Sequence, residues 1–169
     1  MKLQHFILAA LLSFAFVACN WLDGEEQEQT PFFYLFERRI SADGDTAAFV
    51  HIVSRTDTIS VGDTIVFRAE MWSNFSPLRE FRITPSSSNS IEFVWWAPED
   101  SLNLIFDAEA SNYNEGIFVI RGDYYGLTFP FKYVATRAEM NQTLEFRVTN
   151  FGAPGLNTTT VTIRTPIRD

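Results

Sequence analysis

Few residues of this chain have the types and spacing that catalysis requires. The chain has two histidines, and only His51 lies outside the apolar leader at residues 1–18. A serine hydrolase of the common kind places its serine in a Gly-x-Ser-x-Gly turn, which this sequence lacks. One histidine also cannot form a histidine-based metal site. We therefore expect a structural role for His51, and we predict no catalytic residue, metal or cofactor.

Acidic side chains offer the other possible chemistry. Glycoside hydrolysis uses two positioned carboxyl groups. Glu99 adjoins Asp100, and Asp107 with Glu109 would share one face of a strand. The Asp-Gly-Asp turn at residues 43–45 offers oxygen ligands of the kind that calcium prefers. Solvated loop charges explain these residues more simply, so a carboxylate-dependent hydrolase is the third of our three functional hypotheses.

Cys19 is the only cysteine, and it follows an apolar leader that carries Lys2 near its start and small residues at its end. This pattern is typical of a secretory signal, and the leader is shorter than the about 20 apolar residues of a spanning helix. Phe16-Val17-Ala18-Cys19 resembles the lipobox of bacterial lipoproteins, with Phe16 in place of the usual leucine. The resemblance implies cleavage after residue 18 and acylation of Cys19, hence a lipid anchor in a membrane. An ordinary secreted protein with a free thiol is the alternative.

Residues 19–30 are predicted to form an acidic tether, because they are polar and poor in core-forming residues. Asn20 stands where an aspartate would resemble an inner-membrane retention signal, which implies the outer membrane. The acidic run at residues 23–28 resembles the surface-export signal of lipoproteins from Bacteroides-like bacteria, and a solvated linker is the alternative. The formal net charge of −8 argues against nucleic acid and anionic headgroups as partners.

Residues 31–169 have the pattern of an all-β domain. In the clearest strand, residues 64–72, Ile65, Phe67, Ala69 and Met71 point to one face and Trp72 to the other, which is the period-2 pattern of a strand with one buried face. Glycine, proline, asparagine and serine separate further short apolar runs. These predicted strands are residues 32–36, 47–54, 81–84, 91–96, 102–106, 117–121, 127–134, 144–149 and 159–164.

Two segments point to a fold family. Residues 58–67, with the Gly62-Asp63 turn, resemble the first paired strands of bacterial immunoglobulin-like domains. Residues 144–152 and 159–163 resemble their closing hairpin. The resemblance implies a single antiparallel β-sandwich of immunoglobulin-like or fibronectin III-like type across residues 31–169. The Cys–Trp–Cys signature of antibody domains is absent, and a jelly roll is the main rival.

Aromatic residues are the best candidates for binding. Trp72 lies opposite the apolar face of its strand, and successive side chains such as those of Trp95 and Trp96 point to opposite faces. Exposed rings at Trp72, Trp96 and Tyr125 would suit a glycan or a protein surface, unless loops cover them. The leading hypothesis is thus a non-enzymatic binding module at the cell envelope. The second is a fimbrial or envelope assembly subunit that pairs an edge strand with a neighbour.

Short motifs add candidate modification sites. An aspartate precedes, and an aliphatic residue follows, each of Thr46, Thr58, Thr64 and Ser101. This pattern resembles the O-glycosylation signal of Bacteroides-like organisms, although a turn leading into a strand produces it too. The integrin tripeptide at residues 121–123 and three N-glycosylation sequons are short enough to recur by chance.

Overall fold

Apolar side chains alternate along strand β4 (Thr64–Trp72) as the sequence predicts. Ile65, Phe67, Ala69 and Met71 are each at most 1% exposed, because this face of the strand lies against the core. The fold comes from a computed structural model, which describes residues 30–51, 58–95 and 99–169. It is an antiparallel β-sandwich, which confirms the predicted all-β fold class.

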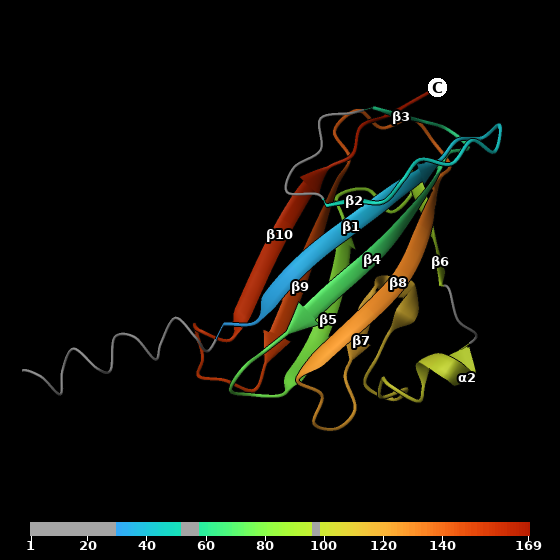
Figure 1. Ribbon diagram of the computed structural model, residues 1–169. Helices are drawn as coiled ribbons and strands as arrows, with labels where there is room; N and C mark the ends of the chain where they lie inside the picture. The colour runs from blue at the N-terminus through green and yellow to red at the C-terminus, as the bar shows by residue number, and fades with distance from the viewer. Residues whose placement is uncertain (1–29, 52–57, 96–98) are drawn as a thin grey trace, which may run out of the picture.

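The first sheet has the strand order β2-β1-β4-β8-β6, with β4 at its centre (Figure 1). Its other members are β1 (Phe32–Ile40), β2 (Val50–His51), β6 (Ile91–Trp95) and β8 (Gly126–Ala135). All neighbouring strands are antiparallel, and the register pairs Phe67 with Glu37 of β1 and with Phe131 of β8. Residues directly opposite each other point to the same face, so one register fixes the contents of both faces.

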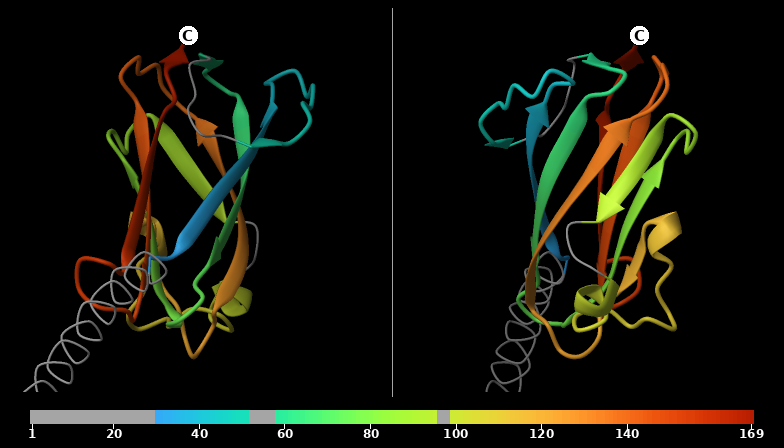
Figure 2. Two further views of the ribbon diagram at one scale, coloured as in Figure 1. Left: turned by 60° about the vertical axis from the view of Figure 1, so that its left-hand side comes forward. Right: turned by 90° about the vertical axis from the view of Figure 1, so that its right-hand side faces the viewer.

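The second sheet packs behind the first as a facing layer (Figure 2). Its strand order is β10-β9-β5-β7, with β5 (Leu78–Pro85), β7 (Ile117–Val119), β9 (Thr143–Asn150) and β10 (Thr158–Arg164). At one end, β3 (Ile59–Ser60) and β11 (Ile167–Arg168) form a short parallel pair. Gly62-Asp63 then leads into β4, and β9 with β10 forms a hairpin where the sequence predicts one.

Phenylalanine rings from both sheets make the core. Phe67 stacks on Phe131 within the first sheet, with ring centroids 5.0 Å apart, and meets Phe146 of β9 edge-on at 5.7 Å. Phe81 of β5 contacts Phe131 across the sheets at 6.3 Å. All four rings are fully buried. Such offset and edge-to-face pairs add about 0.5–1.5 kcal/mol each to the stabilisation from burial alone.

One predicted strand is wrong. Residues 102–106 follow a short helix, α2 (Glu99–Leu102), and the N–H groups of Ile105 and Phe106 donate to the Leu102 carbonyl. A strand would place Leu102, Leu104 and Phe106 on one face. Instead Leu102 and Phe106 are buried and Leu104 is 74% exposed, because one helical turn brings residues four apart to the same side.

The remaining predicted strands are present with shifted ends. The predicted strand at residues 47–54 is reduced to Val50–His51 among the described residues, and Ile52 to Ser54 lie outside them. The residue Trp96, predicted at the end of β6, also lies outside the described residues. Between α2 and β7, a 3₁₀ turn, η1 (Tyr113–Glu115), ends at Gly116, which has a left-handed φ of 70°.

Gly116 gives the first testable prediction, because its backbone lies directly on β5. A Cβ added there would lie 2.3 Å from the Ile83 carbonyl oxygen, whereas a Cβ on Gly44, which also has a positive φ, would meet nothing within 4 Å. We expect Gly44→Ala to lower the unfolding free energy by about 1–2 kcal/mol through backbone strain. Gly116→Ala should cost about 1–3 kcal/mol more through the clash. Urea unfolding measures both, and equal losses would contradict the close approach.

Candidate functional site

The outer face of the first sheet carries a row of aromatic and basic side chains. Successive side chains of β1 point to opposite faces, so Tyr34 and Phe36 point outward because Leu35 points to the core. The register of β1 against β4 then places Trp72 beside Phe32. We call this row the aromatic face. It consists of Phe32, Tyr34, Phe36, Arg38, Phe49, His51, Arg68 and Trp72.

Three rings of the aromatic face stack on one another. The Trp72 ring lies 5.4 Å from the Phe32 ring and 5.1 Å from the Tyr34 ring, with interplanar angles of 18° and 16°. Phe32, Tyr34 and Trp72 nevertheless remain 38%, 40% and 36% exposed. Two neighbouring strands hold the rings nearly parallel, so the stack is a preformed apolar surface with an indole N–H and a phenol hydroxyl as polar groups.

Beyond the stack, the aromatic face continues with a histidine and two arginines that contact aromatic rings. His51 of β2 contacts Tyr34 and Phe36 at 5.4 and 5.3 Å between ring centroids. The Arg68 guanidinium lies 4.6 Å from the Phe36 ring centroid, and the Arg38 guanidinium 4.9 Å from that of Phe49. These are cation–π distances. Hydrogen-bond donors therefore lie within the same surface as the rings.

Glu70 neutralises one of these cations. Its Oε1 lies 2.9 Å from Nε of Arg68, and both side chains are partly exposed. Solvent screens an ion pair of this kind, so it orients Arg68 rather than adding much stability.

The sequence-predicted aromatic residues have different outcomes. Trp72 is exposed at the centre of the stack. Tyr125 is 49% exposed, but it lies in the loop between β7 and β8, where its carbonyl accepts from the Ser73 N–H at 2.8 Å. Trp96 lies outside the described residues.

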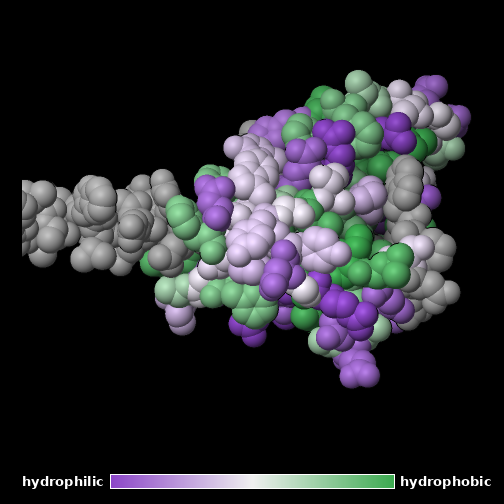
Figure 3. Space-filling model, turned by 60° about the horizontal axis from the view of Figure 1, so that its bottom comes forward, coloured by the Kyte–Doolittle hydropathy of each residue, from purple (hydrophilic) through white to green (hydrophobic). Residues whose placement is uncertain are grey.

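Figure 3 views the lower end of the sandwich of Figure 1, where hydrophilic and weakly polar residues surround small apolar groups.

Sequence reasoning missed the partners of Trp72. Phe32, Tyr34 and Phe36 recur at every second position, which is the signal that could have placed them on one face. His51, which we expected to be structural, lies exposed in the same row. The pairing of β1 with β4 could not be read locally, because it joins segments far apart in the chain.

Of the two predicted acidic pairs, the structure describes the side chains of one. Asp107 and Glu109 do not share a strand face, since the Asp107 carboxylate accepts from the N–H groups of Glu109 and Ala110 at 3.0 and 3.2 Å and so closes a turn. Glu99 and Asp100 lie in α2, and their side chains are outside the described residues. In the described part of the chain, no three His, Cys, Asp or Glu side chains gather as a metal site would require.

The candidate modification sites differ in exposure. Thr46 and Ser101 are exposed, whereas Thr58 and Thr64 are half-buried at the starts of β3 and β4. Residues 121–123 form an exposed part of the loop between β7 and β8. Cys19 and most of the tether lie outside the described residues. Within the ranges that the structure covers, no helix combines the length and the hydropathy of a membrane span.

Comparison with known proteins gives no family assignment. No family model and no curated sequence matches the chain. The similar solved structures include a FixG-related protein from Vibrio parahaemolyticus (10% identity, 63% of this chain and 80% of that one, TM-score 0.34). They also include a family 123 glycoside hydrolase from Clostridium perfringens that acts on glycolipid glycans (14% identity, 80% of this chain and 27% of that one, TM-score 0.36). A third is the cupredoxin domain of amoB from Nitrosocaldus yellowstonii (10% identity, 63% of this chain and 60% of that one, TM-score 0.30). These scores support no inference about function.

The ring stack gives the second prediction. In a double-mutant cycle of Tyr34→Ala and Trp72→Ala, we expect a coupling of about 0.5–1.5 kcal/mol in unfolding free energy, because the two rings contact each other directly. The matched cycle of Tyr125→Ala with Trp72→Ala should show coupling near zero, since Tyr125 contacts this strand through its backbone carbonyl. Chemical denaturation of the six proteins measures both terms. Equal coupling in the two cycles would contradict the stack.

Proposed function

We propose that this protein is an outer-membrane-anchored lipoprotein whose β-sandwich binds a glycan or a protein at the cell envelope without acting as an enzyme. The observation that carries the proposal is the exposed stack of Phe32, Trp72 and Tyr34. Among glycan and protein ligands, the stack favours the glycan. The exposed edges of the stacked rings form an apolar surface on which the C–H groups of a pyranose ring can pack, while the polar groups around them suit its hydroxyls.

The position of the rings supports binding rather than catalysis. Sites on strands hold side chains more precisely than sites on loops do, and the stacked rings belong to β1 and β4. Arg38 and Arg68 place donors beside the rings, where hydroxyl or carboxylate groups of a ligand could accept. Glu70, which lies on the same face of β4 as Arg68 and Trp72, is paired with Arg68.

We further propose that the sandwich is of the immunoglobulin-like kind. In that fold, strands A, B, E and D face strands C, F and G. Here the order β1-β4-β8-β6 faces the order β10-β9-β5. When the seven strands are lettered A to G in chain order, these two orders become A-B-E-D and G-F-C, which supports the same arrangement. One departure is that the chain passes from β5 to β6 in the first sheet and back to β7 in the second before it enters β8.

Glycan binding is tested with the mature protein by affinity electrophoresis through a panel of soluble polysaccharides. The wild type should be retarded by at least one of them. Trp72→Ala and Tyr34→Ala should each weaken that binding by about 2 kcal/mol, as removal of a central aromatic anchor does. Phe75→Ala is the matched control, because Phe75 is an exposed ring in the loop after β4. Undiminished retardation of the stack variants would show that the binding surface is elsewhere.

The lipid anchor is tested separately. In cells that make the full chain, we expect the intact mass of the mature protein to correspond to a start at Cys19 with added acyl chains. Two or more chains anchor stably, whereas one gives marginal binding. Cys19→Ala should therefore move the protein from the membrane fraction to the soluble fraction. A mature form that starts elsewhere, or that carries an unmodified thiol, would contradict the anchor.

A further inference from the structure

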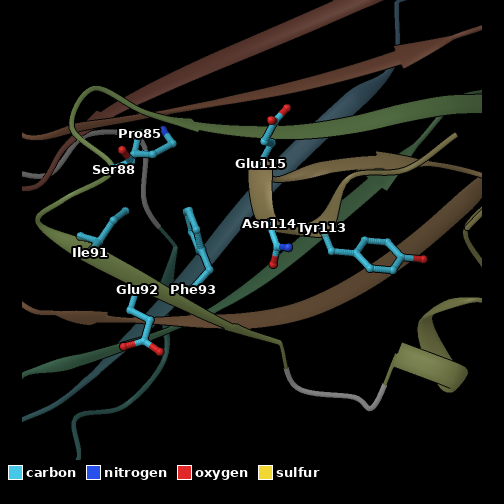
Figure 4. A pocket seen from close by; sticks show the side chains of 8 residues that line it. All are labelled: Pro85, Ser88, Ile91, Glu92, Phe93, Tyr113, Asn114 and Glu115. Atoms are coloured by element: carbon cyan, nitrogen blue, oxygen red, sulfur yellow. The ribbon is translucent and has the colours of Figure 1, made fainter. Parts of the chain in front are cut away.

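A cavity of about 600 Å³ opens at the opposite edge of the first sheet from β1 and β2 (Figure 4). It lies between the η1 turn and the β5–β6 connection, which crosses from the second sheet to the first. The side chains that matter for its chemistry are Ser88, Ile91, Glu92, Phe93, Asn114 and Glu115. Its volume falls within the about 300–1,000 Å³ of small-molecule sites. Because β8 and β4 separate β6 from β1, this cavity is distinct from the aromatic face.

The wall that the β5–β6 connection forms is held by hydrogen bonds of buried residues. The Ser90 hydroxyl lies 2.9 Å from Oε1 of Gln142, and both residues are buried. The Gln142 amide in turn donates to the Thr143 carbonyl at 3.1 Å. The Thr136 N–H donates to the Ser90 carbonyl at 2.9 Å. These bonds fix the segment between Ser88 and Phe93 to the β8–β9 connection.

The opposite wall is a closed turn. The Asn112 side chain accepts from the Glu115 N–H at 3.3 Å, and the Gly116 N–H donates to the Tyr113 carbonyl at 3.1 Å. The Gly116 carbonyl accepts from the Ile83 N–H at 2.9 Å, which ties the turn to β5. Both walls are therefore preformed, and a ligand would not have to order them.

The side chains that reach the space have complementary chemistry. The Phe93 ring rises from β6 into the cavity, and the Asn114 amide points toward it from η1 (Figure 4). Ile91 extends the apolar floor beside Phe93, and Ser88 lies in the β5–β6 connection. An aromatic ring facing an amide can pack against a C–H face and bind adjacent hydroxyls at the same time.

The charges around the cavity limit the ligand further. None of its described lining residues is basic, and Glu92 and Glu115 lie at its rim with their carboxylates turned away from Phe93 and Asn114 (Figure 4). Two carboxylates at the rim disfavour an anionic ligand through their charge. We propose that the cavity binds a single neutral pyranose sugar ring, with Phe93 as the stacking platform and Asn114 as the hydroxyl-binding amide. This proposal does not depend on binding at the aromatic face.

The test is a titration of the ¹⁵N-labelled mature protein with the methyl glycosides of glucose, galactose and mannose. We expect at least one glycoside to give saturable NMR shifts in residues 86–93 and 112–117. Asn114→Ala should weaken that binding at least about tenfold, or 1.4 kcal/mol. Phe93→Leu, which keeps apolar volume but removes the ring, should weaken it also. Asn74→Ala, at an exposed asparagine after β4, is the matched control and should bind as the wild type does.

Any one of the following results would overturn the proposal. The first is the absence of saturable shifts with all three glycosides, and the second is unchanged binding by Asn114→Ala with a native-like spectrum. The third is tighter binding of glucuronate or of an alkylammonium ion than of any neutral glycoside, which would assign the cavity another ligand class. Trp72→Ala separates the two sites, because it should leave this titration unchanged even if it abolishes polysaccharide binding. Loss of the shifts in Trp72→Ala would instead assign the sugar to the aromatic face.

Discussion

The packing of phenylalanine rings between the two sheets is the interaction on which the rest of the structure depends. Phe67 and Phe131 of the first sheet meet Phe146 and Phe81 of the second, and all four are fully buried. With Cys19 as the only cysteine, no internal disulfide can supplement this core. The burial of large aromatic side chains must therefore hold the sheets together, at about 25 cal/mol per Å² of apolar surface.

The aromatic face is a consequence of that packing. Once Leu35 and the inner residues of β4 point to the core, the pleat turns Tyr34 and Trp72 outward, and the antiparallel register brings them together. The stack is therefore as rigid as the strands that carry it. A one-residue slip of β1 against β4 would turn Tyr34 toward the core and expose Leu35, so the core selects the register that forms the face.

The two proposed sites use different parts of the sandwich. The aromatic face lies on the paired strands β1 and β4. The cavity beside Phe93 forms where β6 and the η1 turn approach each other, and hydrogen bonds hold the wall on each side. Gly116 allows the η1 turn to lie directly against β5 at this cavity, since any Cβ at this position would collide with the Ile83 carbonyl oxygen. Both sites follow from rigid scaffolding, which preorganises a surface for binding.

Local patterns in the sequence were sufficient for the β class, for most strands and for the outward direction of Trp72, because side-chain alternation is a property of each strand alone. The lipid attachment expected at Cys19 likewise rests on four consecutive residues and the leader before them. Residues 102–106 were misread because a short apolar run does not distinguish a strand from a helical turn. Only the tertiary structure decided that Phe32 and Tyr34 flank Trp72, and that Asn114 faces Phe93. These neighbours come from distant segments, and it is the burial of the shared core that brings them together.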